Sequence, residues 1–123
     1  KKKSKKLISL SNELKSKYYT FNVNDIYKIK SSFKQIEKID ILVNSAGINI
    51  SKNFLNLKDR DWKEIYNTNI FGVSNVIKYA LPVLKKSSKQ TKIINIASVK
   101  GTYSAVGHVA YASSKAALIN LTS

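Results

Sequence analysis

A tyrosine and a lysine near the end of the chain have a spacing that suits proton transfer. Tyr111 precedes Lys115 by four residues, so the two side chains share a face if this segment is helical. A phenol ordinarily titrates near pH 10, and a neighbouring ammonium stabilises its phenolate form. In a chain with 22 lysines and arginines and seven tyrosines, one such pair is expected by chance. The pair therefore becomes informative only with other residues beside it.

Three polar positions upstream supply that context. The segment Asn-Ser-Ala-Gly at 44–47 follows an apolar run, and Ser98 follows a second one. Asn69 lies within a helical pattern, where asparagine is a poor helix former. Taken singly, each is typical of an ordinary turn, helix or surface residue. Because ligands bind beyond the carboxyl ends of parallel strands, the ordered set indicates a site.

Hydrophobic periodicity predicts the elements that must position these residues. We expect helices over 1–17, from Asp25 to about 36, from a cap at Asp59 towards Leu84, and from Ala110 onward. Apolar or β-branched runs predict strands over 18–23, 40–44 and 92–97. The alternation of helices with buried strands predicts an α/β fold with a doubly wound parallel sheet. We expect residues 1–123 to form part of a single domain.

In order and spacing these motifs resemble the short-chain dehydrogenase/reductase family. The matching residues are Asn44 to Gly47, Asn69, Ser98 and Tyr-Ala-Ser-Ser-Lys at 111–115, and the resemblance extends from about Lys5 to Ser123. Within the family the chain looks similar to 3-oxoacyl-carrier-protein reductases. The resemblance implies a Rossmann-type sheet that is incomplete here, without the first βαβ unit and the C-terminal strands.

The resemblance also implies a reaction, the interconversion of a ketone or 3-oxo group and a secondary alcohol by hydride transfer with NAD or NADP. Tyr111 would be the general acid and base, and Lys115 would favour its phenolate and bind the nicotinamide ribose. Ser98 would polarise the carbonyl, and Asn69 would hold a kinked helix and a water of the proton relay. His108 is read either as a loop residue or as a wall of the substrate pocket.

Cofactor contacts carry over less completely. Asn44, Ala46 and Gly47 match the motif beside the adenine ribose that braces the central strand, and Asn22 and Val23 match an adenine-contacting pair. Asn22 stands where the family usually has aspartate. The glycine-rich turn that cradles the pyrophosphate in the family is not in this sequence. We therefore expect the isolated segment to be inactive and the protein that contains it to be an active reductase.

The composition of the chain limits which other functions it can have. The chain has no cysteine and one histidine, so we expect no metal site, and no apolar run is long enough to span a membrane. A net charge of +15, almost all from lysine, fits either compositional drift or an acidic partner, which could be an acyl-carrier protein. The alternatives are a non-catalytic binding protein on the same fold and a basic nucleic-acid-binding module. The resemblance favours a cytoplasmic homo-oligomer, a dimer or tetramer, that binds a small carbonyl or alcohol substrate and no nucleic acid.

Overall fold

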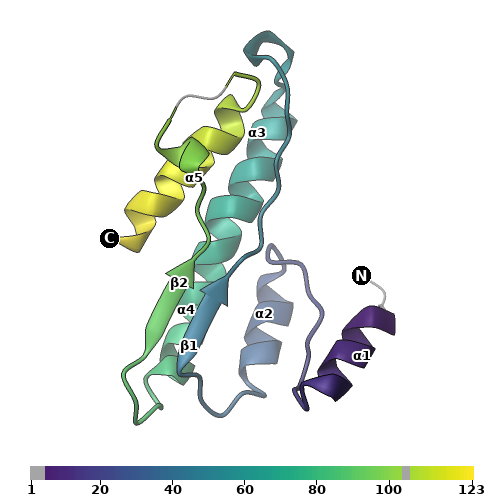
Figure 1. The fold of residues 1–123 in the computed structure, drawn as a ribbon, viewed down its shortest axis with the longest axis vertical. Coiled ribbons are helices and arrows are strands. Elements are labelled where there is room, and N and C mark those ends of the chain that lie inside the picture. Colours follow the sequence, from purple (N-terminus) through teal and green to yellow (C-terminus); the bar gives the residue numbers. More distant parts are fainter. Residues whose placement is uncertain (1–4, 104–105) are drawn as a thin grey trace.

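A computed structural model describes residues 5–103 and 106–123 of the chain (Figure 1). The helices are α1 (Lys5–Glu13), α2 (Ile26–Phe33), α3 (Asp59–Tyr66), α4 (Val73–Leu84) and α5 (Val109–Thr122). The strands are β1 (Ile41–Asn44) and β2 (Lys92–Asn95). Short 3₁₀ turns span Phe54–Asn56 and Val99–Gly101, and a π-helical segment spans Asn67–Gly72. The first four residues of the predicted N-terminal helix lie outside the described residues.

The two strands form a parallel pair, as predicted. Ile41 pairs with Lys92 and Asn44 pairs with Asn95, so both strands end at the same edge. The prediction of a strand over 18–23 is wrong, because these residues form no strand in the structure. Their aromatic and β-branched side chains favour an extended backbone, but a strand also needs a neighbouring ladder to pair with. The one ladder among the described residues joins β1 to β2.

One long helical run connects the two strands. It comprises α3, the segment 67–72 and α4, and Figure 1 shows them as one continuous column. The predicted helix from residue 59 to Leu84 is therefore present. The predicted cap is displaced by one residue, because the N-cap is Lys58 and Asp59 is the first helical residue. Asp61 satisfies the free amide of Lys58, its Oδ2 accepting a bond of 2.9 Å. Asp25 does cap α2, accepting from the Lys28 amide at 3.1 Å.

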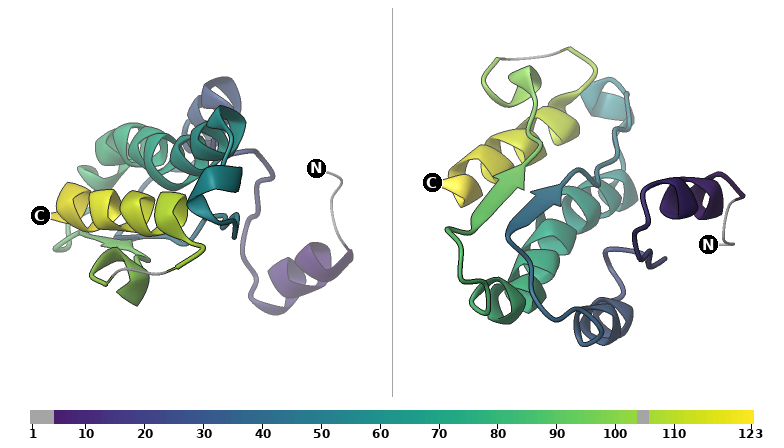
Figure 2. Two further views of the ribbon diagram at one scale, coloured as in Figure 1. Left: turned by 90° about the horizontal axis from the view of Figure 1, so that it is seen from above. Right: turned by 60° about the horizontal axis from the view of Figure 1, so that its bottom comes forward.

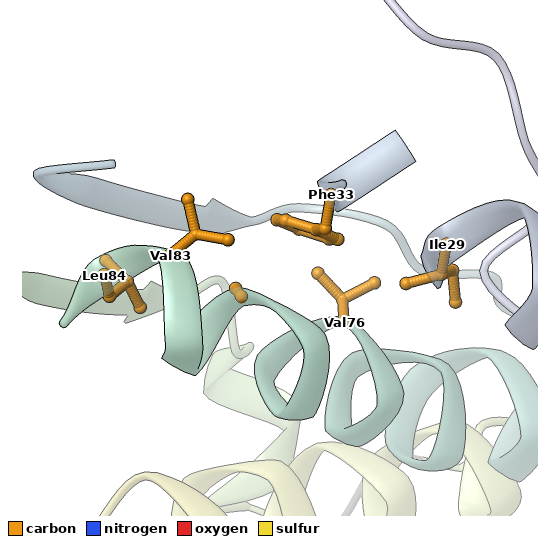
Figure 3. Close-up of a cluster of buried hydrophobic side chains, with 6 residues drawn as sticks. Ile29, Phe33, Val76, Val83 and Leu84 are labelled. Atoms are coloured by element: carbon orange, nitrogen blue, oxygen red, sulfur yellow. The ribbon is translucent and has the colours of Figure 1, made fainter. Parts of the chain in front are cut away.

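The hydrophobic core lies between α2, α4 and the inner face of the sheet. Figure 3 shows Ile29 and Phe33 of α2 facing Val76 and Val83 of α4. Leu42 of β1, together with Ile93 of β2, packs against this cluster. Ile29 is fully buried, and burying such a side chain contributes about 1.5–3 kcal/mol. The core thus fixes the strands against the helix that carries Asn69.

The opposite face of the sheet is open. In Figure 2 the helices α3, α4 and α5 lie on one side of the two strands. The alternate strand residues on the other side are 44–55% exposed: Ile41, Val43 and Ile94. The helix α1 stands apart from the rest of the molecule in all views. Among the described residues, no helix has both the length and the apolar character that crossing a membrane requires.

Candidate active site

Asn69 joins three parts of the chain at the carboxyl edge of the sheet. Its side chain is fully buried. Its Oδ1 accepts a bond of 2.9 Å from the Ile48 amide, and its Nδ2 donates to the Ile48 carbonyl at 3.0 Å and to Ser114 Oγ at 2.9 Å. The turn after β1 and the helix α5 are therefore tied to the long helix by one side chain.

The helix is widened around Asn69 into a π-helical segment. A π-helix is rare and often marks a functional site, because it re-aims side chains within an otherwise regular helix. Gly72 ends this segment and lies against Val23, since a Cβ at Gly72 would be 2.6 Å from Val23 Cγ2. The lack of a side chain there lets the residues 21–24 approach the helix. The widened helix therefore lies close to both Val23 and Ile48.

Lys115 is a buried cation beside Tyr111. The lysine is 5% exposed, and its Nζ lies 5.8 Å from the centroid of the Tyr111 ring. The Nζ donates a bond of 2.6 Å to the Ile96 carbonyl just beyond β2. A Cβ at Gly47 would lie 3.6 Å from the same Nζ and 3.5 Å from Asn69 Oδ1. Burying an ammonium is costly unless it is bonded, so its position in this corner is strongly constrained.

Ser98 lies in the turn between β2 and the helix of Tyr111. Its Oγ accepts a bond of 3.2 Å from the Lys100 amide and caps the short turn Val99–Gly101. A hydroxyl that accepts one bond keeps its own hydrogen for donation. This turn packs closely on α5, because a Cβ at Gly101 would be 2.9 Å from the Lys115 carbonyl carbon. The structure thus brings the turn of Ser98 against the helix that carries Tyr111 and Lys115.

A hollow of about 630 Å³ lies beside the turn after β1, and Gly47 and Ile48 are among the residues that line it. Among the residues that line it are four predicted cofactor contacts: Asn22, Val23, Ala46 and Gly47. The other three predicted contacts, Asn44, Tyr111 and Lys115, are not among the lining residues. Asn44 points elsewhere. Its Nδ2 donates to Asn95 Oδ1 at 2.8 Å, and Asn95 in turn donates to Thr122 Oγ1 at 3.0 Å. Asn44 therefore braces β1 against β2 and α5, and it is absent from the residues that line the hollow.

Three residues of this region were not predicted from the sequence. Glu64 and Thr68 line the hollow from the long helix. Their spacing of four residues places Glu64 and Thr68 on one face of the helix, and this spacing is the signal that the sequence contains. The sequence does not show that this face meets residues 22–24. Ser114, which bonds Asn69 and also donates to the Tyr111 carbonyl at 2.7 Å, was read only as part of the motif.

The whole chain matches the family model described as short chain dehydrogenase, over residues 1–123. The chain belongs to the short-chain dehydrogenase family. It is 36% identical over 108 residues to a 3-oxoacyl-[acyl-carrier-protein] reductase FabG of Thermotoga maritima, covering 85% of this chain and 44% of that protein. It is 34% identical over 94 residues to the peroxisomal hydratase-dehydrogenase-epimerase of Saccharomyces cerevisiae, covering 76% of this chain and 10% of the relative.

A solved structure has the same arrangement. The ligand-free aldohexose dehydrogenase of Thermoplasma acidophilum superposes with a TM-score of 0.82 at 30% identity, over 88% of this chain and 44% of that one. The predicted fold class, an incomplete doubly wound Rossmann-type sheet, is therefore confirmed. The chain spans 44% of the length of the Thermotoga maritima FabG and 44% of the length of the Thermoplasma acidophilum aldohexose dehydrogenase.

Proposed function

We propose that the complete protein containing this chain is an NAD(P)-dependent oxidoreductase that interconverts a ketone or 3-oxo group and a secondary alcohol. The observation that carries the proposal is the convergence at one sheet edge. Fully buried Asn69 and nearly buried Lys115 both approach Gly47, and Lys115 lies over the Tyr111 ring. A buried ammonium beside a phenol is an arrangement suited to proton transfer.

Each of the four residues has a separate role in this proposal. Tyr111 donates a proton to the carbonyl oxygen as the carbon receives a hydride, and it takes the proton back in the reverse reaction. Lys115 stabilises the phenolate that Tyr111 leaves behind. Ser98 donates a hydrogen bond to the carbonyl oxygen and orients it. Asn69 positions Tyr111 and Lys115 by holding their helix at Ser114, and it also holds the turn after β1 at Ile48.

The residues present fit part of a nicotinamide dinucleotide. We propose that Asn22, Val23, Ala46 and Gly47, which line the hollow, contact its adenosine half. An ammonium has three donors, so the bond from Lys115 to Ile96 leaves Lys115 able to bind ribose hydroxyls as well. When bound, the cofactor supplies or accepts the hydride. The chain's four glycines, at 47, 72, 101 and 107, form no phosphate cradle. We assign NAD or NADP without a preference.

The relatives suggest the class of substrate and partner. One is a 3-oxoacyl-[acyl-carrier-protein] reductase and another an aldohexose dehydrogenase. We propose a small carbonyl or alcohol substrate, with a 3-oxoacyl group on an acyl-carrier protein as the first to test. An acidic carrier would suit a chain with a net charge of +15. We also propose that the complete protein is a cytoplasmic homo-oligomer.

Isotope transfer tests the reaction directly. The complete protein would be incubated with 3-oxoacyl thioesters and with NADH or NADPH deuterated at C4 of the nicotinamide. We expect deuterium at the carbinol carbon of the product in at least one combination. A protein that binds the reduced cofactor and transfers no deuterium to any tested ketone would be a non-catalytic member of the family, contrary to the proposal.

A further inference from the structure

The loop after β1 rests against the turn that leads into α5. The Lys52 amide donates a bond of 2.9 Å to the Gly107 carbonyl. A second contact joins the same two segments, since Asn49 Nδ2 lies 3.1 Å from His108 Nδ1. Gly107 has a φ of +74°, a backbone conformation that side-chain-bearing residues rarely adopt. His108 is the N-cap of α5, so these contacts act where the helix of Tyr111 begins.

An ion pair anchors this loop to the long helix. Lys52 Nζ lies 2.7 Å from Asp61 Oδ2. Asp61 is 4% exposed, and its carboxylate also accepts the Lys58 amide at 2.9 Å. The hydrogen bond from Lys52 and then the amide of Lys58 hold the pKa of Asp61 below its ordinary value of 3.8. Asp61 is therefore charged at neutral pH, and the short distance and the buried carboxylate distinguish this pair from the fully exposed pairs that contribute little.

The two ends of the loop are thus fixed by the same helical column. Asn69 holds Ile48 at one end, and Asp61 holds Lys52 at the other. Between these anchors the loop offers Asn49 and the Lys52 amide to the Gly107–His108 turn. A shift of the loop would move that turn, which lies three to four residues before Tyr111. The loop is therefore placed to set the substrate side of the candidate active site.

We propose that Lys52 and Asp61 are positioning residues, which hold the loop of residues 48–53 against the Gly107–His108 turn and so set the approach of the carbonyl substrate to Tyr111. The consequence for catalysis rests on the proposed function. The contact between the loop and the turn does not, and it can be measured without turnover. A purely structural role at the start of α3 would stabilise the helix and leave the turn undisturbed.

The test uses the complete protein with Lys52→Met and Asp61→Asn, and with Lys52→Arg as the conservative variant. Lys63→Met is the matched control, because Lys63 is an exposed lysine on α3, the helix that contains Asp61. Amide hydrogen exchange at position 52 reports the bond to Gly107. Steady-state kinetics with the carbonyl substrate report KM and kcat separately, and thermal unfolding shows whether each variant is folded.

We expect faster exchange at position 52 in Lys52→Met and Asp61→Asn, with protection restored in Lys52→Arg. We also expect kcat/KM to fall by up to about 100-fold, mainly through KM, because misplacing a substrate wall by about 1 Å has an effect of that order. Unchanged exchange at position 52 in folded variants would overturn the proposal. So would the same rise of KM in Lys63→Met. If neither the parent protein nor any variant reduces the carbonyl substrate, the proposed function is wrong. The hydrogen-exchange result would still show whether Lys52 and Asp61 hold the loop against the turn.

Discussion

Asn69 is the residue on which the candidate site depends most. Its amide uses both its oxygen and its nitrogen on Ile48 and adds a bond to Ser114. Few other side chains present a donor and an acceptor in the same plane at this length. Aspartate would lose both donors, and leucine would remove the partner of the Ile48 amide and carbonyl. The identity of the residue is therefore explained by its local hydrogen bonds, whatever the reaction.

Replacing Asn69 with alanine should loosen the site. The amide and carbonyl of half-buried Ile48 would lose their partner, and each lost hydrogen bond contributes about 0.5–1.5 kcal/mol. We therefore expect a lower free energy of unfolding for Asn69→Ala in urea. Asn67→Ala is the matched control, because Asn67 belongs to the same π-helical segment and is exposed. Equal stability of the two variants would show that the Asn69 network is energetically neutral.

The position of Asn69 was readable from the sequence, and its partners were not. An asparagine in a helical pattern upstream of Ser98 and the Tyr-Lys pair was sufficient to single it out. Its contacts with Ile48 and Ser114 join residues 21 and 45 positions apart. Side-chain direction across such separations depends on how the helix widens at 67–72, and sequence periodicity contains no information about that widening.

At the scale of elements, the helices and the paired strands followed from hydrophobic periodicity. The apolar runs that begin at Ile41 and Lys92 form strands because each has the other as a parallel neighbour. The run over 18–23 has comparable propensity and forms no strand, since the one ladder in the described part of the chain joins β1 to β2. Strand propensity thus describes how a segment fits a sheet, and the sheet must exist for the strand to form. Helices satisfy their own backbone, which is why they were predicted more completely.

The π-helical widening of the long helix has a similar origin. Periodicity of 3.6 residues predicts a regular helix from residue 59 to Leu84, and the apolar positions do follow it. The widening at 67–72 serves contacts outside the helix, with Val23 through Gly72 and with Ile48 through Asn69. Local propensity favours a regular helix, and tertiary contacts decide the exception.

At the level of the whole molecule, the described residues form a two-stranded sheet with helices on one face. Its helices α3, α4 and α5 cover one face of the sheet, and apolar strand residues such as Val43 are exposed on the other (Figure 2). The relatives FabG and aldohexose dehydrogenase are more than twice as long as the matched region. The contacts of Asn69 and Lys115 in the candidate site all join residues between Gly47 and Lys115.

The residues present in the chain also limit how tightly the isolated chain can bind a dinucleotide. The hollow beside Gly47 offers contacts for an adenosine group, and no glycine-rich helix N-terminus is present to bind phosphates. We therefore expect the isolated 123-residue chain to bind NADH and NADPH more weakly than micromolar, as measured by cofactor fluorescence or calorimetry. Micromolar affinity in a folded sample would show that the residues present are sufficient for the cofactor.

Removing one oxygen atom tests whether Tyr111 is the proton donor. In the complete protein, Tyr111→Phe deletes the proposed proton donor, and Tyr27→Phe makes the same change on an exposed tyrosine of α2. We expect Tyr111→Phe to lower kcat for ketone reduction by about 10²–10⁴-fold, the usual contribution of a general acid. Cofactor affinity should stay close to that of the parent, and Tyr27→Phe should turn over normally. Parent-like turnover by a folded Tyr111→Phe protein would contradict the account, because the proton would then have to come from another group.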